Sequence, residues 1–449
     1  MNNSILKLSM AFFAGLLIIS QSNAQEVWSL QDCKQKALDH NQKVKSAISD
    51  YKASEAGLKL SQRAHLPNIN FESSYLYLKD PNQMKIPGYE LPSTNGLPSG
   101  VWSPASTNNL TYENTYSASL GLSLPIYMGG KLQHAKHISS LALELAADHV
   151  ELTKSDLLLD VEEKYWGLVS LKEQKTVLEK SVILLTDVVK QVTNWYETGI
   201  VTKNEVLKAQ VELNNVKLAY LELKNNVELS KMSLNQTIGN GILSSIKIQD
   251  SILIIPGQLS AVAFDENQLN DRPEVKMLNN QLEISKTQKK LVNADYMPQL
   301  VSFANYMMQN PNHYAEQEDE FTFNAGVSLN IPVFHWGEKK LKKQQQQMSI
   351  QKAGYEIDQN IEFIVLEIRQ SIFRLRESLV KLNFTQTSLA QAEENLKLEK
   401  NQLMEGISTT SDLLDAQVQW QQSHADYINA KAKVKTYEAA YYKSIGQLK

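Results

Sequence analysis

The sequence predicts a mixed α/β membrane protein in which amphipathic strands lead into very long helices, as an internal tandem repeat. Three observations predict this class. Two segments alternate between apolar and small or polar residues, the pattern of a strand with one face in lipid. Each is followed by a long segment without proline. The strand segments also end in similar motifs, SLPIYMGGK from Ser123 and NIPVFHWGE from Asn330.

The N-terminus has the layout of a secretory signal peptide, for which we expect residues 1–24. Lys7 precedes an apolar run from Met10 to Ile19, and small residues end at Ala24. The run is too short to span a bilayer, and no later run reaches the roughly 18 apolar residues of a transmembrane helix. We therefore expect an exported chain without a transmembrane helix.

Composition excludes several other classes. Cys33 is the only cysteine, so no intrachain disulfide or cysteine-based zinc site is possible. The formal charge of -4, which becomes -5 without Lys7, is too mild to suggest nucleic acid as a partner. Only 18 Gly and 12 Pro in 449 residues favour a largely helical chain.

The tandem repeat is read from constant offsets. Aligning Pro125 with Pro332 fixes an offset of 207 residues that also pairs Gly199 with Gly406. We expect a first repeat over 25–239, a linker over 240–270 and a second repeat over 271–449. Upstream, Pro67 matches Pro298 at an offset of 231, so the first repeat carries 24 extra residues. These fall in the proline-rich segment 79–111, which we expect to be a loop.

Each repeat reads as helix, strand, loop, strand, long helix, turn and helix. The second strands, 116–126 and 321–333, alternate cleanly, whereas the first strands, 69–78 and 300–308, alternate less well. The segment 131–196 would measure about 99 Å as one helix. Its distal part carries apolar residues at coiled-coil spacing, and so does the returning segment. The two predicted seams are Leu178, Val182, Leu185, Val189, Val192 and Tyr196, and Val206, Ala209, Leu213, Val216, Tyr220, Leu223 and Val227.

Four strands cannot close a barrel alone, and an open sheet edge in lipid leaves backbone groups unpaired at a cost of several kcal/mol each. We therefore expect several chains to share one barrel of eight, twelve or sixteen strands. The alternative is a soluble sandwich with one strand face in a core. It lacks a second sheet, because the remaining segments read as helices.

The repeated motifs mark the passage from strand to helix. Pro125 and Pro332 lack an N–H donor, so we expect each to end its β-ladder. Gly130 and Gly337 allow the sharp turn that follows. The aromatic residues between them suit the interface of lipid and water.

At these residues the sequence resembles the TolC-type outer-membrane efflux proteins over essentially the whole mature chain. The resemblance rests on the doubled plan, the motifs LPIYMGG and IPVFHWG, and the hairpin tips YETGIVTKNEVLKAQ and MEGISTTSDLLDAQ. It implies a homotrimer in the outer membrane of a Gram-negative bacterium, with four strands per chain in a twelve-stranded barrel and a long helical barrel in the periplasm. It also implies a periplasmic adaptor and an inner-membrane pump of the RND, ABC or MFS type, which together export drugs, metals or proteins. No cofactor is implied.

The resemblance places a gate at the helix tips, where aspartates ring the pore. The matching positions are Asp412 and Asp415, on one helical face. Glu205 lies at the equivalent tip of the first repeat. A local alternative remains open, because 409–412 and 202–205 both read as capping boxes. That alternative is favoured for Glu205, whereas Asp415 has no capping duty. The tip turns Gly199, Ile200, Gly406 and Ile407 are the implied adaptor contacts.

Two departures from the family pattern stand out. The arginine and tyrosine that lock the closed tips in well-known members fall here on Ser408 and Leu403, which cannot make those bonds. The chain also runs only three residues past Gly446. We therefore expect the girdle around mid-barrel to come mostly from 240–270.

Two other functions compete with this reading. An enzyme has little support, because His134 and His137 lack a third ligand in register and no catalytic motif stands out. A non-conducting, structural coiled-coil envelope protein would fit the heptads alone. The small residues on one face of the second strands count against it, since a barrel plugged by its own side chains would need larger ones.

Overall fold

A computed structural model describes residues 27–91, 100–249, 252, 269–270, 272–314 and 316–448. The expected signal peptide and most of the linker 240–270 lie outside the described residues. Across the described part of the chain, every helix falls short of the length and apolar character that crossing a membrane requires.

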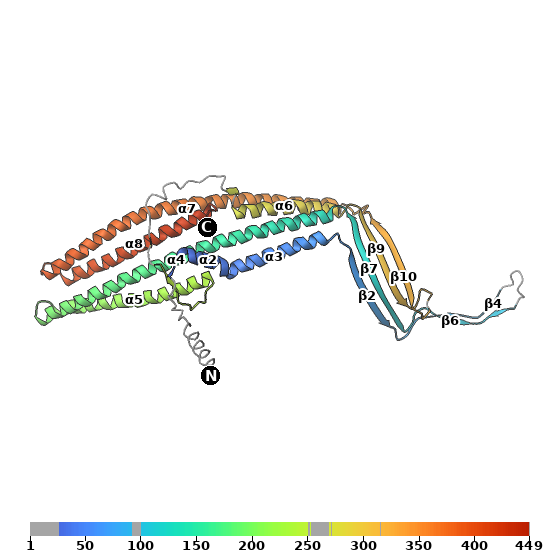
Figure 1. The fold of residues 1–449 in the computed structure, drawn as a ribbon, viewed down its shortest axis with the longest axis horizontal. Helices are drawn as coiled ribbons and strands as arrows, with labels where there is room; N and C mark the ends of the chain where they lie inside the picture. Colours follow the sequence, from blue (N-terminus) through green and yellow to red (C-terminus); the bar gives the residue numbers. More distant parts are fainter. Residues whose placement is uncertain are drawn as a thin grey trace, which may run out of the picture. The chain divides into compact units, whose positions relative to one another are not determined.

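The same order of elements follows twice along the chain (Figure 1). The short strand β1 (Val27–Trp28) and helix α2 (Leu30–His40) come first. Next come α3 (Gln42–Arg63), β2 (Asn68–Tyr77), β7 (Asn114–Met128), α4 (Lys131–Glu197) and α5 (Lys203–Ile238). After β8 (Lys247–Ile248), the chain forms α6 (Pro273–Ala294), β9 (Gln299–Asn310), β10 (Glu320–Asn330), α7 (Glu338–Met404) and α8 (Thr410–Ser444).

The four long strands form one antiparallel sheet in the order β10-β9-β7-β2. The expectation that Pro125 ends its ladder is wrong, because β7 continues to Met128 with a register shift between Pro125 and Tyr127. Pairing of β7 with β2 has already stopped at Ser123, so the missing N–H of Pro125 interrupts no bond on that side. In β10 the strand ends at Asn330, before Pro332, and the predicted strand 321–333 was too long.

The sheet has one apolar and one polar face. Cross-strand pairing aligns a row of apolar residues, and the neighbouring row consists of amides and a glycine. The apolar row is Phe71, Leu120, Tyr306 and Phe323, each at least half exposed. The polar row is Asn70, Gly121, Asn305 and Asn324, in which Asn305 donates a hydrogen bond to Asn324. Apolar side chains therefore stay uncovered across the whole width of the sheet.

Segment 79–111 contains more structure than the predicted loop. The strands β3 (Gln83–Ile86) and β6 (Ser106–Asn109) pair in antiparallel fashion, and so do β4 (Tyr89–Glu90) and β5 (Trp102–Ser103). A Cβ on Gly88 would lie 2.7 Å from the Trp102 ring, so this glycine makes room for the aromatic side chain. The extra residues thus form a hairpin whose alternation the prolines conceal.

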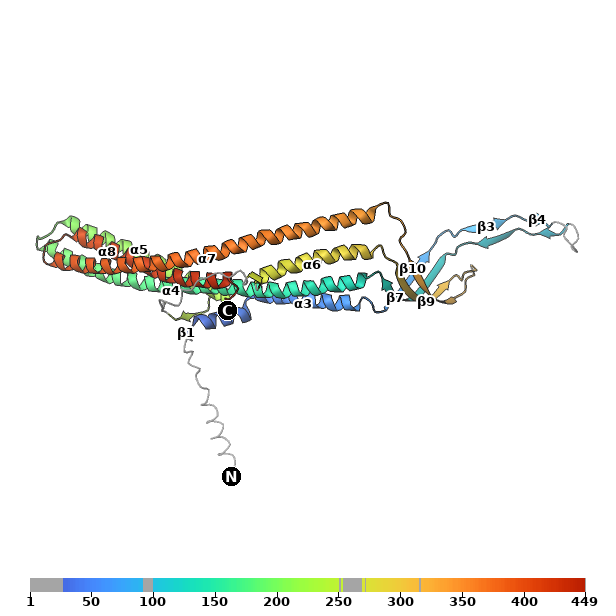
Figure 2. The same ribbon diagram turned by 90° about the horizontal axis from the view of Figure 1, so that it is seen from above.

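The helices α4 and α5 form one antiparallel hairpin and α7 and α8 form another (Figure 2). The predicted seams meet as expected in two buried clusters. One contains Leu178, Leu185, Leu213 and Val216, and the other contains Val192, Val206 and Ala209. Tyr196 is the exception, because 43% of it is exposed.

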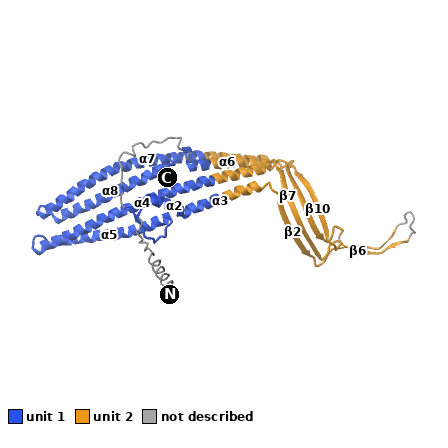
Figure 3. Ribbon diagram, viewed as in Figure 1, with its two compact units in different colours: residues 1–51, 145–278, 356–449 blue, residues 52–144, 279–355 orange. Residues whose placement is uncertain are grey.

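The chain divides into two compact units (Figure 3). Unit 1 comprises residues 1–51, 145–278 and 356–449, and unit 2 comprises residues 52–144 and 279–355. Unit 2 holds the four-stranded sheet, whereas unit 1 holds the helix tips and the largest buried cluster. That cluster joins Cys33, Val161, Leu168 and Leu234, among others. Burial raises the pKa of the Cys33 thiol to about 12.

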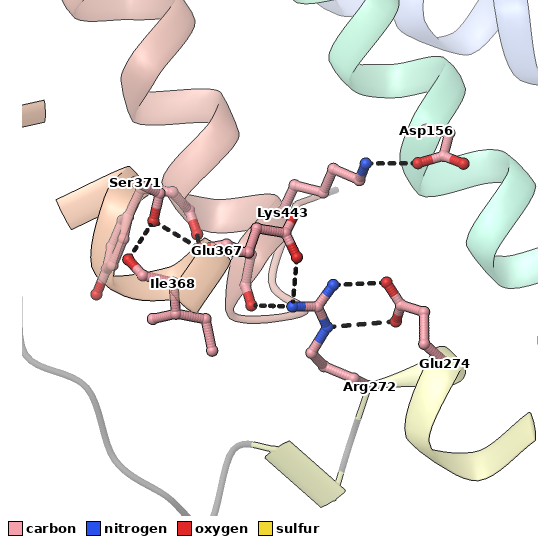
Figure 4. Close-up of polar contacts among 9 residues, drawn as sticks. Asp156, Arg272, Glu274, Glu367, Ile368, Ser371 and Lys443 are labelled. Carbon is pink, nitrogen blue, oxygen red and sulfur yellow. Dashed lines mark hydrogen bonds and ion pairs between the residues drawn. The ribbon is translucent and has the colours of Figure 1, made fainter. Parts of the chain in front are cut away.

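Arg272 joins three segments of unit 1 (Figure 4). Its guanidinium binds the carboxylate of Glu274 through two nitrogens, Glu367 of α7 at 3.0 Å and the backbone oxygen of Ser444 in α8 at 2.9 Å. Burial would raise the pKa of Glu274, but the hydrogen bonds from Arg272 outweigh it and hold that pKa below its usual value. The planar, five-donor guanidinium suits such a multiple contact.

Candidate functional site

Both hairpin tips end in the same backbone geometry. At the first tip, Gly199 has a φ of 77°, its N–H bonds to Tyr196 O, and Ile200 N–H bonds to Trp195 O. At the second, Gly406 has a φ of 73° and Ile407 N–H bonds to Gln402 O. These are Schellman motifs, which glycine favours because a positive φ is costly for other residues. The following Ile200 and Ile407 are 69% and 70% exposed, so each tip presents an apolar side chain.

Behind the turns lies a small apolar core of unit 1. Leu403 is buried there against Val192, Val206 and Leu413. Ser408 donates a hydrogen bond from its Oγ to Glu399 O at 3.4 Å. The two positions at which family members carry a lock are thus used here for packing and for a local backbone contact.

Asp412 closes the capping box that the sequence offers. Its Oδ2 accepts hydrogen bonds from Thr409 N at 2.9 Å and from Thr409 Oγ1 at 2.6 Å, and Thr409 Oγ1 accepts from Asp412 N. Hydrogen bonds from the Thr409 side chain and backbone lower the pKa of Asp412. The carboxylate is exposed, so capping leaves one face of it open to solvent.

The favoured capping role of Glu205 is wrong. Thr202 is the N-cap of α5 but makes no side-chain capping bond. Glu205 instead lies 3.0 Å from Lys208 Nζ, one turn further along the same helix. An ion pair at i,i+3 competes with the capping geometry, and the lysine ammonium is the stronger partner here.

Lys208 is the tip residue that sequence reasoning missed. Its Nζ also donates to Ser411 Oγ of α8 at 2.9 Å, which links the two hairpins. The spacing of Glu205 and Lys208 was visible in the sequence. The contact with Ser411 spans 203 residues and depends on how the hairpins pack, which no local pattern encodes.

Asp415 lines a groove between α5 and α8. The groove has a volume of about 430 Å³ and an apolar floor that includes Leu207, Val211 and Val418. Lys208, Glu212 and Asp415 supply charges along it. Asp412 and Asp415 are both exposed in the first turns of α8, so the two carboxylates point to solvent from one helix.

The strand-to-helix turns lie in unit 2. Gly130 has a φ of 87° between β7 and α4, and Gly337 has a φ of 80° before α7. The preceding Gly129 is packed tightly, because a Cβ there would approach Met297 Cβ to 2.4 Å. His134 and His137 follow in α4. No group of three or more His, Cys, Asp or Glu side chains that could hold a metal ion occurs within the described residues.

Comparison with known proteins agrees with this architecture. The family model described as outer membrane efflux protein matches residues 34–240 and 266–447. The chain is 19% identical to the alkaline protease secretion protein AprF of Pseudomonas aeruginosa, over 72% of this chain and 69% of that one. It is 18% identical to the outer membrane protein TolC of Escherichia coli, over 93% of this chain and 82% of that one.

Solved structures share the fold. The Campylobacter jejuni CmeC outer membrane channel gives a TM-score of 0.76 at 18% identity, covering 93% of this chain and 85% of that one. VceC of Vibrio cholerae gives 0.73 at 15% identity, covering 93% and 96%. The family match spans most of both halves of the chain and includes both helical tips and all four long strands. This protein therefore belongs to the outer membrane efflux protein family, whose TolC-type members are outer membrane channels that extend into the periplasm.

Proposed function

We propose that this protein is the exit duct of a tripartite efflux or type I secretion system. The observation that carries the proposal is the open sheet of unit 2, whose outer strands β2 and β10 each have a partner on one side among the described residues. Its apolar row is exposed across all four strands. Such a sheet satisfies its backbone in lipid only when both edges are paired.

Three copies of the chain supply these pairs. Joining β10 of one copy to β2 of the next gives a closed barrel of twelve strands around a polar lumen. The amide row would line the lumen and the aromatic row would face lipid. The duplicated plan, with repeats over 25–239 and 271–449, gives each chain two strand pairs and two helical hairpins for this assembly.

Exposed apolar stripes on the helices support the same assembly. Helix α7 carries one stripe at mostly heptad spacing, and α5 carries another. The α7 stripe is Phe363, Leu366, Phe373, Val380 and Phe384, and the α5 stripe is Leu207, Val211, Leu218, Leu221 and Leu229. Contiguous apolar surface of this kind marks an interface. We assign the two stripes to contacts between neighbouring copies.

The tips supply the gate and the docking surface. Three copies would place six carboxylates from Asp412 and Asp415 around one opening, which favours cations. The exposed Ile200 and Ile407, with the groove beside Asp415, offer an apolar surface for a helical hairpin of a periplasmic adaptor. An inner-membrane pump would then select the cargo, and the duct itself would need no catalytic residue or cofactor.

Disulfide trapping tests the assembly. Within one chain β2 and β10 are separated by two strands, or about 14 Å at ordinary strand spacing, which is beyond disulfide reach. A cysteine in β2 at Ser74, combined with one in β10 at Thr322, Asn324 or Ser328, can therefore react only between copies. The buried Cys33, with its raised pKa, stays out of the reaction.

We expect one of these pairs to give covalent trimers in intact membranes. The matched control is Ser74→Cys with Ser117→Cys, whose Oγ atoms lie 2.8 Å apart on adjacent strands and which should link within one chain. Monomers from every β2–β10 pair, alongside a working control, would contradict the shared barrel. Trimers that never conduct would favour the structural envelope protein instead.

A further inference from the structure

Four lysines occupy the first two turns of α7, immediately after the sheet. We call Lys339, Lys340, Lys342 and Lys343 the lysine patch. We propose that the lysine patch binds the anionic headgroups of phospholipids in the inner leaflet of the outer membrane. The proposal rests on the insertion of the sheet into that membrane, which is part of the proposed function.

The segment before the patch is built to lie in lipid. Val333 and Trp336 are each 89% exposed and Phe334 is 68% exposed, so this is among the most uncovered apolar stretches of unit 2. Phe334 and Trp336 contact each other edge to face at 4.9 Å between ring centroids. Tryptophan beside aliphatic residues is typical of the boundary between acyl chains and headgroups. The lysines that follow within seven residues therefore reach the headgroup layer.

The patch carries excess positive charge. Residues 331–343 contain four lysines and one acid, Glu338, a formal charge of +3 in a chain whose total is -4. Glu338 is already bound to Lys342 at 2.5 Å. Within the described residues neither Lys340 nor Lys343 has a carboxylate partner. The charge thus stays available for an anion from outside the chain.

The rest of the site is preformed. The Nζ atoms of Lys339 and Lys342 both lie 5.7 Å from the centre of the Tyr296 ring. A ring face holds ammonium groups by cation–π attraction without neutralising them. Tyr296 thereby keeps two lysines of the patch together, and their charge remains free to attract a phosphate.

The fold does not require these lysines. Positive side chains at a helix N-terminus oppose the macrodipole, so the patch lowers the intrinsic stability of α7. At the offset of 207 residues, the first repeat has Leu132, Gln133, Ala135 and Lys136, and α4 begins equally well. The charge is therefore confined to one of two equivalent helix starts, which indicates a role outside folding. Basic clusters at a membrane boundary attract anionic lipid.

Native mass spectrometry of the purified, delipidated full-length protein tests the proposal. The probes are phosphatidylglycerol and phosphatidylcholine with identical acyl chains, added to detergent micelles. We expect the wild type to retain phosphatidylglycerol about threefold or more over phosphatidylcholine. Replacing all four lysines of the patch by glutamine should bring the ratio close to one, and replacing them by arginine should preserve it.

The matched control replaces four lysines of unit 1, Lys190, Lys224, Lys397 and Lys400, by glutamine and should keep the preference. A second measurement uses the wild type alone. Raising salt from about 0.1 M to 1 M should abolish the preference, and inorganic phosphate at equal concentration should compete poorly because it lacks acyl chains. Equal retention of both lipids by the wild type, or an unchanged preference in the glutamine variant, would overturn the lipid site. Conductance of the same sample separates that result from a failure of the exit-duct proposal.

Discussion

Lys208 of α5 donates a hydrogen bond to Ser411 of α8 at 2.9 Å, and its ammonium also lies 3.0 Å from Glu205 of its own helix. The contact joins the two helical hairpins beside the groove that Asp415 lines. The positions of the familiar lock hold Ser408 and Leu403, so this chain connects its tips with different residues. The link is partly exposed, which limits its strength.

Breaking the link should loosen the tips. We expect Lys208→Met to increase the open probability of the channel about two- to fivefold, because exposed ion pairs contribute about 0.2–1 kcal/mol. Lys231→Met is the control, since Lys231 pairs with Glu228 at the same i,i+3 spacing in α5. Single-channel recording makes the comparison, and equal effects of the two substitutions would remove Lys208 from the tip mechanism.

The two tip helices should respond differently to loss of their N-cap threonine. Thr409→Ala removes a capping bond from α8 and should destabilise its first turn by about 1 kcal/mol. Thr202→Ala should have little effect, because Thr202 makes no side-chain capping bond. Hydrogen exchange of the first turns of α5 and α8 measures both. Faster exchange in α5 than in α8 would contradict the capping assignment.

Neighbouring residues of β2 should tolerate charge differently. Phe71→Arg places a cation in the apolar row and should cost about 2–4 kcal/mol near the middle of the bilayer. Asn70→Arg lies in the polar row, so it should insert normally and shift conductance toward anions. Heat-resistant trimer in isolated membranes is the readout. Normal assembly of Phe71→Arg would show that the apolar row does not face lipid.

Arg272 should be a major determinant of stability in unit 1. Arg272→Met leaves Glu274 and Glu367 without their shared cation and should cost about 1–3 kcal/mol. This is less than the 3–5 kcal/mol of a fully buried pair, because the Glu367 side chain is 46% exposed. Arg272→Lys keeps the charge but not the fork and should fall between the two. Thermal unfolding measures the series, and a wild-type melting temperature for Arg272→Met would refute the role.

His424 should make stability depend on pH. Burial lowers its pKa below the ordinary value of 6.5, opposed by Glu393 and reinforced by Lys180 and Lys431. The unfolded chain then binds a proton at a higher pH than the folded chain does. Stability is full above about pH 6.5 and falls as the pH drops toward the folded pKa. Melting temperatures from pH 8 to 5.5 should fall more steeply for wild type than for His424→Gln, and parallel slopes would contradict this.

Local patterns predicted much of the fold. The alternation at 116–126, the coiled-coil spacing from Leu178 and the glycines at the tips each encode an element within a few residues. The bulge at Pro125 was not predictable, because it depends on where the pairing with β2 stops. Strands β3 to β6 were hidden for a similar reason, since prolines and short lengths obscure period-two patterning.

The site was predicted only in part. The box of Thr409 and Asp412 follows from four consecutive residues, so its geometry could be read directly. The matching box at Glu205 failed because a lysine one turn away competes for the carboxylate. The contacts of Lys208 with Ser411 and of Arg272 with Ser444 span 203 and 172 residues. Such contacts depend on helix packing, which periodicity does not specify.

Single-channel conductance in planar lipid bilayers tests the central claim most directly. The purified chain would be compared with the double variant Asp412→Asn, Asp415→Asn, each with and without a trivalent cation. The proposed function predicts stable conductance that the cation blocks in the wild type and not in the variant. Conductance that ignores the aspartates would leave Asp412 as a cap and place the gate elsewhere. Absence of conductance from correctly inserted trimers, even after Lys208→Met, would contradict the exit duct.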